Sequence, residues 1–364
     1  MPRSFPTTPS AIEPEWLTAS LRSTGTITSS RVTGIELASI GEGVGMLAVL
    51  TRIGLTYDQP EAGAPVSIVA KFASTNEANR AVATAFGVYK REALFLRDIA
   101  GLTTVPVPTI HAVDFDATSG DFVIVMEDLD GYRTGDQVVG CGPDEAAVIL
   151  DAAAPLHARF WGAVDHDVLS FIPRVNGEMQ RSTMSGACAV GWDPCLERFG
   201  AAIPDAVRAS RDRFLAAAPA LHDRMGALTQ TVVHGDLRLD NIMFGQSPTH
   251  RPLVLLDWQG VLISASVQDV AYLLTQNLTT GERRTHERSL LAHYHSRLVE
   301  HGVVGYDVDT LWDDYRLAAL YVFIYAVVIG GTLDPGNERG MAFMSKLIER
   351  STATIVDHDL LSLL

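Results

Sequence analysis

The sequence predicts an α+β protein with a strand-rich N-terminal lobe followed by a mainly helical C-terminal lobe. Apolar and polar residues alternate from Val32 to Tyr57, the pattern of half-buried strands, and a short apolar run from Val66 to Ala73 predicts another strand. Helical periodicity dominates after residue 128. We therefore predict an N-terminal lobe over residues 1–128, with an antiparallel sheet and one long helix, and a helical lobe over residues 129–364.

Further elements follow from the same patterns. The N-terminal lobe is expected to add helices at residues 13–23 and 76–100 and strands at 111–116 and 121–127. Gly87 marks an irregularity in the second of these helices. In the C-terminal lobe two short strands are expected around Asn241 and Asp257. Helical patterns there cover residues 144–163, 203–225, 282–301, 309–329 and 338–356.

The composition is that of an ordinary globular protein, with 47% hydrophobic and 20% charged residues. A net charge of −15 argues against nucleic acid as a partner. The three cysteines form no Cys-x-x-Cys pair, so we expect neither disulfides nor zinc, and a cytoplasmic location. The apolar segment 317–333 is slightly short for a membrane span and is flanked by acids, so we expect a buried helix and no membrane span.

The most informative segment runs from Thr231 to Phe244, with the sequence TVVHGDLRLDNIMF. It places Asp236 and Asn241 in one loop that leads into an apolar strand, and a second apolar strand, LVLLDW, ends at Asp257. Such a set suits phosphoryl transfer from ATP, because one carboxylate can orient an acceptor hydroxyl while an amide oxygen and a second carboxylate hold Mg²⁺. We therefore predict Asp236 as a catalytic residue and Asn241 and Asp257 as metal ligands.

The order HGDLxxxN followed by LDW resembles the aminoglycoside phosphotransferase and choline kinase superfamily, most narrowly its ecdysteroid-kinase-like branch. The resemblance covers almost the whole chain. It implies a bilobal protein-kinase-like fold, ATP and Mg²⁺ as cofactors, and a small molecule as the phosphoryl acceptor. A protein kinase is a weaker alternative, because Trp-Gln follows Asp257 in place of Phe-Gly and the distance to Asp269 leaves no room for a long activation segment.

The resemblance also assigns residues on the nucleotide side. A glycine loop between two expected strands, IGEGVGM, would approach the phosphates through Gly41, Gly43 and Gly45. Lys71, in an apolar strand, must find an anion or reach water, and the family pairs such a lysine with the phosphates and a helix glutamate. We predict Glu92 as that partner, with Glu77 as the competitor. The strand and hinge would contact the adenine through the backbone of Met126, Glu127 and Asp128.

Several neighbours of the catalytic loop have two possible roles. Arg238 either stabilises the transferred phosphoryl group or forms a salt bridge. Asp269 caps a helix or braces the loop. His157 and Trp161, four residues apart on one helix face, are expected in the core, and Asp240 in solvent.

The acceptor half of the resemblance is less specific. Aromatic residues either line an acceptor pocket or pack in the core; they are Trp192, Trp312, Tyr315, Tyr321 and Tyr325. A largely apolar hydroxylated acceptor fits their composition. Alternatives are an aminoglycoside, a choline-type amine held by aromatic rings with Asp313 or Asp314, and a pseudokinase that binds nucleotide without turnover.

Overall fold

The computed structural model describes residues 5–40 and 47–364 of the chain. Two compact units are present. The N-terminal unit comprises residues 1–102, 107–132 and 256–260, and the C-terminal unit comprises residues 103–106, 133–255 and 261–364. The expected order of an antiparallel sheet followed by a helical region is confirmed. The boundary between residues 128 and 129 stays a prediction.

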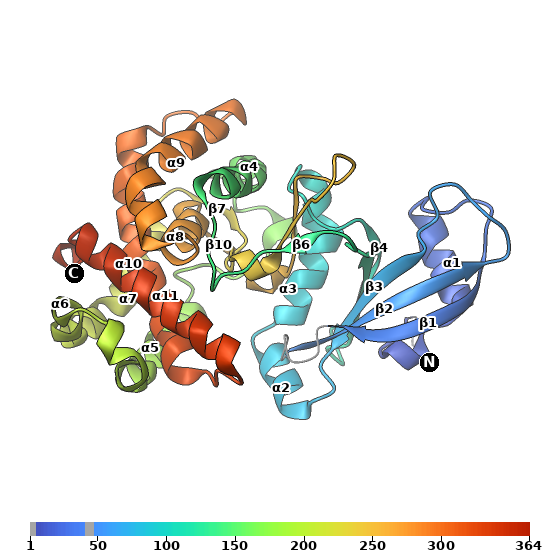
Figure 1. Ribbon diagram of the computed structural model, residues 1–364, viewed down its shortest axis with the longest axis horizontal. Helices are drawn as coiled ribbons and strands as arrows, with labels where there is room; N and C mark the ends of the chain where they lie inside the picture. The colour runs from blue at the N-terminus through green and yellow to red at the C-terminus, as the bar shows by residue number, and fades with distance from the viewer. Residues whose placement is uncertain (1–4, 41–46) are drawn as a thin grey trace. The chain divides into compact units, whose positions relative to one another are not determined.

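An antiparallel sheet with the strand order β1-β2-β3-β5-β4 forms the centre of the N-terminal unit (Figure 1). Its strands are β1 (Val32–Ile40), β2 (Ala48–Tyr57), β3 (Ser67–Ala73), β4 (Ile110–Phe115) and β5 (Phe122–Glu127). Alternate residues of β3, including Ile68 and Phe72, pack with Leu17 and Leu21 of helix α1 (Pro14–Ser23) in one apolar cluster. Because side chains alternate along a strand, Lys71 points to the opposite face of the sheet.

The segment expected to form one long helix is broken. Helix α2 (Glu77–Ala85) ends before Gly87, which has a φ of +64°, and α3 (Val88–Leu94) continues through a π-helical turn at Phe95–Ile99. Glycine adopts this left-handed conformation without a steric penalty. The irregularity predicted at Gly87 is therefore confirmed, and it divides the helix in two.

Helices make up most of the C-terminal unit, and its strands are short. The helices are α4 (Pro143–Arg159), α5 (Glu178–Phe199), α6 (Asp205–Ala209), α7 (Arg211–Ala227), α8 (Val267–Gln276), α9 (Thr280–Glu300), α10 (Val308–Thr332) and α11 (Glu338–Asp357). The strands are β6 (Arg133–Thr134), β7 (Gln230–Val233), β8 (Ile242–Phe244), β9 (Leu253–Leu255) and β10 (Leu262–Ala265). β7 pairs with β10, and β8 pairs with β6 and β9, all antiparallel.

Helix α10 packs against α5, α8 and α11 (Figure 1). Within the described residues it is the one helix long and apolar enough to cross a membrane, and 72% of its most apolar window is buried inside the protein. This burial agrees with the core helix expected from the sequence. All three cysteines are also buried and free, and burial raises the pKa of each thiol to about 12.

Helix α5 was not predicted, although it has 22 residues. It contains Pro194 and the two glycines Gly186 and Gly191, and it has no continuous apolar stripe that would indicate a helix. Tertiary packing explains its composition. A Cβ atom on Gly331 of α10 would overlap the carbonyl oxygen of Gly191, so the two backbones are in contact where α5 meets α10.

This contact predicts opposite effects for two glycine substitutions. Gly331→Ala should destabilise the protein by about 1–3 kcal/mol, because the new methyl group has no space against the α5 backbone. Gly186→Ala is the matched control: it lies in α5 with no atom near its Cβ position. The control should stabilise the protein by about 0.4–1 kcal/mol through lower entropy of the unfolded chain. Urea denaturation measures both; equal effects would contradict the close packing.

Candidate active site

In the N-terminal unit a lysine lies between two carboxylates. Lys71 Nζ is 2.7 Å from Glu92 Oε2 and 3.1 Å from Asp257 Oδ1. Lys71 and Glu92 are buried, whereas the Asp257 side chain is 35% exposed. β3 directs Lys71 to the face of the sheet on which α3 presents Glu92. The structure therefore shows the pairing expected from the sequence, with Glu92 as the partner, and adds Asp257 to it.

The two carboxylates keep the lysine charged. Burial alone would lower the pKa of Lys71, but the negative charges of Asp257 and Glu92 outweigh it and hold the pKa above its ordinary value. Gln259 also hydrogen-bonds the Glu92 side chain. Because Glu92 is enclosed and Asp257 is partly exposed, Asp257 is the carboxylate of this group that solvent or a ligand can reach.

The backbone at Asp257 has an unusual conformation. Its φ is +62°, and among the described residues other than glycine only Asp359 shares a positive φ. Such conformations are costly and persist where neighbouring structure holds them. The next residue, Trp258, is buried and stacks on Phe95, with ring centroids 4.0 Å apart. This stacking holds the turn that directs the Asp257 carboxylate towards Lys71.

The predicted adenine-contacting residues lie at the end of β5. Met126 is paired with Val69 within the sheet, and the Glu127 N–H donates to the Thr109 carbonyl at 2.8 Å. The Asp128 carboxylate accepts a hydrogen bond from the Ser67 hydroxyl at 2.7 Å and another from Arg52 Nη2 at 3.0 Å. These bonds tie the hinge to β2 and β3. The Glu127 amide is engaged in the sheet, so an adenine contact through it would require that bond to open.

The predicted phosphate-contacting glycines lie outside the described residues. They are Gly41, Gly43 and Gly45. Their role stays a prediction.

In the C-terminal unit the loop after β7 brings Asp236 and Asn241 together. Asn241 Nδ2 donates to the Asp236 carbonyl and to its Oδ2, both at 3.0 Å. The amide nitrogen therefore faces Asp236, and the Asn241 Oδ1 is the atom suited to a cation. Arg238 Nε lies 3.2 Å from Asp236 Oδ2, and its guanidinium lies over the ring of Phe343. Arg238 thus forms the salt bridge that was one of its two possible roles.

Asp269, near the start of α8, braces this loop. Its Oδ2 accepts from the His234 N–H at 2.7 Å and its Oδ1 from the Gly235 N–H at 2.9 Å. His157 Nε2 lies 3.1 Å from the same carboxylate, and His157 Nδ1 is 2.8 Å from the Tyr294 hydroxyl. Of the two roles left open for Asp269, the structure shows the brace. His157 is buried as expected, and its contact with Asp269 was not predicted.

Asp240 is not a solvated residue, contrary to the expectation from the sequence. Its side chain is 15% exposed and lies 2.8 Å from Arg339 of α11, and it also accepts from the Gln137 N–H. The Leu239 N–H donates to Asn277 Oδ1 at 2.9 Å. Arg339 lies 99 positions from Asp240 in the sequence, and Asn277 lies 38 positions from Leu239. No local sequence pattern therefore indicates these contacts. They hold the second half of the loop as Asp269 holds the first.

The aromatic residues considered for an acceptor pocket have different environments. Trp192, Tyr315 and Tyr321 are buried in the core. Trp312 is partly exposed, but the Arg288 guanidinium lies 3.2 Å from its ring centroid. One face of the Trp312 ring is therefore already occupied by a cation.

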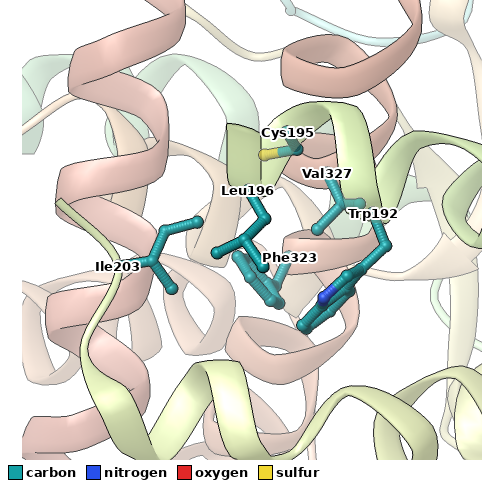
Figure 2. A pocket seen from close by; sticks show the side chains of 6 residues that line it. All are labelled: Trp192, Cys195, Leu196, Ile203, Phe323 and Val327. Carbon is teal, nitrogen blue, oxygen red and sulfur yellow. The ribbon is translucent and has the colours of Figure 1, made fainter. Parts of the chain in front are cut away.

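A small apolar pocket lies between α5 and α10 (Figure 2). It is lined by Trp192, Cys195, Leu196, Ile203, Phe323 and Val327. On an α-helix, residues two positions apart differ in direction by roughly 200°. Phe323 and Val327 therefore face away from the side of α10 that carries Tyr325. The pocket is separate from the Tyr325 side of α10.

The antiparallel sheet with its lysine–glutamate pair, together with the Asp/Asn loop of the helical unit, defines a kinase-like protein with the bilobal protein-kinase-like fold. The chain belongs to the ecdysteroid kinase-like family, whose model matches residues 42–303. It is thereby a member of the superfamily of small-molecule kinases that includes aminoglycoside phosphotransferases and choline kinases. No curated protein matches the sequence.

Solved structures show the same fold. A putative aminoglycoside phosphotransferase from Ralstonia eutropha JMP134 is 17% identical, with a TM-score of 0.53, over 95% of this chain and 97% of that one. Choline kinase from Cryptosporidium parvum Iowa II is 11% identical, with a TM-score of 0.54, over 90% and 92%. The GDP complex of wild-type aminoglycoside 2′-phosphotransferase-IIIa is 16% identical, with a TM-score of 0.51, over 92% and 97%.

The brace at Asp269 predicts a loss of stability with a defined pH dependence. Asp269→Asn should destabilise the protein by about 1–3 kcal/mol at pH 7, because a buried backbone N–H loses its acceptor. Burial alone would raise the pKa of Asp269, but the hydrogen bond and charge of His157 outweigh it and lower the pKa. The ionised group therefore contributes stability above its unfolded pKa of about 3.9, and this contribution is lost as the pH falls through the folded pKa.

The difference in the free energy of unfolding between wild type and Asp269→Asn should accordingly be constant from about pH 5 to 8 and become smaller below about pH 4. Urea denaturation at several pH values measures it. Asp193→Asn is the control, because that side chain is 69% exposed and pairs with Arg211 at the surface. It should change stability by less than about 1 kcal/mol. A difference that grew on acidification would contradict the assigned brace.

Proposed function

We propose that this protein is an ATP- and Mg²⁺-dependent phosphotransferase that phosphorylates a hydroxyl group of a small molecule. The observation that carries this proposal is the charged Lys71 held by the enclosed Glu92 and the accessible Asp257. A buried lysine kept positive beside a partly exposed carboxylate suits the phosphates of a nucleotide and their metal ion. Family membership supports the same chemistry.

Three parts of the chain would form the nucleotide side. Lys71 would contact the phosphates, and the glycine loop and the segment from Met126 to Asp128 would hold the rest of the nucleotide. Because the Glu127 N–H is engaged with Thr109, the backbone at Asp128 is better suited to the adenine edge. One structural relative was solved with GDP, so GTP is tested beside ATP.

Asp257 and Asn241 fit Mg²⁺ because they offer hard oxygen atoms. The Asp257 carboxylate is partly exposed, and the bonds of Asn241 Nδ2 direct its Oδ1 away from Asp236. Mg²⁺ is usually held by one or two carboxylates plus substrate phosphates. In the described part of the chain no three His, Cys, Asp or Glu side chains gather as a complete cage. When bound, the ion would neutralise charge on the phosphates.

Asp236 would orient the acceptor hydroxyl and accept its proton. Its carboxylate is held by Asn241 and Arg238, yet 31% of the side chain is exposed. The phosphoryl-transfer transition state is loose, so correct placement of the acceptor oxygen matters more than strong basicity. Arg238, already beside Asp236, would add positive charge near the transferred group.

The acceptor is proposed to be an uncharged or weakly charged molecule with an apolar part. The solvent-reaching residues of α10 beyond Tyr325 include Val328 and Ile329, and α10 has no charged residue from Leu317 to Thr332. A choline-type acceptor is less well supported, because Arg288 covers Trp312 and Asp314 bonds Tyr306. An aminoglycoside would require several carboxylates that converge on the site.

Nucleotide binding should depend on magnesium. At about 100 times its Kd, MgATP should stabilise the protein by about 2.7 kcal/mol, because it binds only the native state. A thermal-shift titration with ATP, GTP and EDTA measures this effect. Asp257→Asn should keep its fold but lose most of the magnesium-dependent stabilisation by ATP. Equal shifts with magnesium and with EDTA would refute the metal assignment.

Asp236→Asn should retain MgATP binding and lose turnover by about 10²–10⁴-fold. The amide keeps the shape of the side chain but cannot accept the acceptor's proton. Release of ADP with a panel of alcohols, sugars and sterols would measure turnover, and the thermal shift would measure binding. Turnover near the wild-type level would exclude this role. Binding of MgATP with no turnover of any acceptor by the wild type would favour a pseudokinase.

A further inference from the structure

One face of helix α11 runs along the proposed catalytic loop. Arg339 Nη2 is 2.8 Å from Asp240 Oδ1, and the guanidinium of Arg238 lies 5.5 Å from the centroid of the Phe343 ring. Arg350, farther along α11, bonds backbone segments that contact the same loop. An α-helix turns by about 100° per residue, so positions 339, 343 and 350 lie within about 40° of one another around the helix axis. Their side chains therefore share one face of α11.

Arg350 is buried, with 4% of its surface exposed, and its hydrogen-bond partners among the described residues are all backbone carbonyls. Nη1 donates to the Gln137 carbonyl at 2.6 Å and to the Gln276 carbonyl at 3.2 Å. Nη2 donates to the carbonyls of Val138 at 3.0 Å and Val139 at 3.4 Å. A buried charge is costly unless polar groups compensate it. The rigid guanidinium fork can join several acceptors at once, which a lysine cannot do.

The four carbonyls belong to two separate segments, and both segments bond the catalytic loop. Residues 137–139 follow β6, and the Gln137 N–H donates to Asp240 Oδ1 at 3.1 Å. The other carbonyl ends α8, and the next residue, Asn277, accepts from the Leu239 N–H at 2.9 Å. The arginine therefore joins the two segments that hold neighbouring residues of the loop.

Close packing at Gly140 supports the same arrangement. Gly140 has a φ of +88°, and a Cβ atom placed on it would lie 2.9 Å from the Asn277 carbonyl oxygen and 3.1 Å from Arg350 Nη2. The Cys141 N–H donates to the same Asn277 carbonyl at 3.1 Å. The segment before α4 is thus in direct contact with the end of α8, and the guanidinium lies at this contact.

We propose that Arg350 is a positioning residue that joins residues 137–139 to the end of α8 and thereby fixes the turn Leu239–Asn241 of the catalytic loop. This inference rests on the proposed function of Asp236 and Asn241. Asn241 is the last residue of that turn and donates two hydrogen bonds to Asp236. A loosened turn would therefore displace both groups together.

The expected consequence is a loss of turnover with little loss of nucleotide affinity. A misplacement of about 1 Å at reacting groups can lower a rate by about 10²-fold. Lys71, Glu92 and Asp257 belong to the N-terminal unit, whereas the segments that Arg350 joins belong to the C-terminal unit. Loss of Arg350 should therefore leave the lysine group unchanged.

Hydrogen exchange followed by mass spectrometry tests the positioning and needs no substrate. Arg350→Met removes the donors and keeps an unbranched side chain. The peptides covering residues 135–141 and 237–243 should then exchange roughly tenfold faster or more, because local opening of these segments no longer breaks hydrogen bonds to a charged group.

Arg283→Met is the matched control. Arg283 is 1% exposed and lies in α9 of the same unit, but it pairs with Glu287 and Asp357. The control should lower the free energy of unfolding, which urea denaturation measures. It should leave the two loop peptides at their wild-type exchange rates, because Arg283 bonds neither segment that Arg350 joins.

Arg350→Lys is the milder variant, to be used if Arg350→Met does not fold. Lysine keeps the positive charge but has no planar fork. Exchange of the two peptides should therefore be faster than in wild type and slower than in Arg350→Met. In Arg350→Ala, about 10 mM guanidinium, far below denaturing concentrations, should slow the same exchange again, and tetramethylammonium should not.

Turnover tests the consequence for catalysis. Release of ADP is measured with water and with alcohols as acceptors. In Arg350→Met, kcat should fall by roughly 10–100-fold while KM for ATP changes by less than about threefold. Arg283→Met should keep both values at a temperature where it is folded.

Unchanged exchange of both peptides in Arg350→Met and Arg350→Lys would overturn the proposal. An equal increase in Arg283→Met, or an unchanged kcat in a variant whose loop exchanges faster, would overturn it as well. A titration of the wild type with MgATP separates this inference from the kinase function. Faster loop exchange in Arg350→Met, beside a wild type that neither binds MgATP nor releases ADP, would refute the kinase function and support the role of Arg350 in holding the loop.

Discussion

The buried positive charge of Lys71 is the constraint on which the N-terminal unit depends. An ammonium taken out of water is stable only beside opposite charge. The sheet supplies the lysine from β3, α3 supplies Glu92, and the turn after β9 supplies Asp257. The left-handed backbone at Asp257 and the stacking of Trp258 on Phe95 follow from the same requirement, because they direct the second carboxylate to the lysine.

In the C-terminal unit a buried negative charge has the equivalent role. Asp269 accepts two backbone N–H groups of the catalytic loop and contacts His157, which is held by Tyr294. The loop is therefore shaped by residues that would not touch a substrate. Asp236 and Asn241 keep their mutual geometry because their backbone is fixed, and their side chains remain available for chemistry.

Much of the fold could be predicted from local signals in the sequence, and the Lys71–Glu92 pair from the family resemblance together with them. A lysine in an apolar strand requires an anion, and Gly87 interrupts the helical pattern of residues 76–100. Helix α5 could not be predicted, since its glycine serves a contact with α10 that only the folded chain reveals. Asp240 was expected in solvent because nothing near it in sequence indicates Arg339.

Contacts between distant residues account for the rest of what the sequence did not indicate. Gln180 and Tyr325 are 145 positions apart, and His157 and Asp269 are 112 apart. Tyr325 was noted among the aromatic residues, but nothing near it in the sequence indicated its contacts with Tyr321 and Gln180. Such contacts belong to a network of side chains, and no single residue type indicates them.

The burial of all three thiols has a practical consequence for spectroscopy. Only the thiolate reacts with maleimides or iodoacetamides, and a pKa of about 12 leaves almost none of it at neutral pH. A cysteine introduced on the surface would therefore react far faster than Cys141, Cys188 or Cys195. Spin labels or fluorophores could be attached at chosen positions in both units while the native cysteines stay in place, so that interlobe distances become measurable.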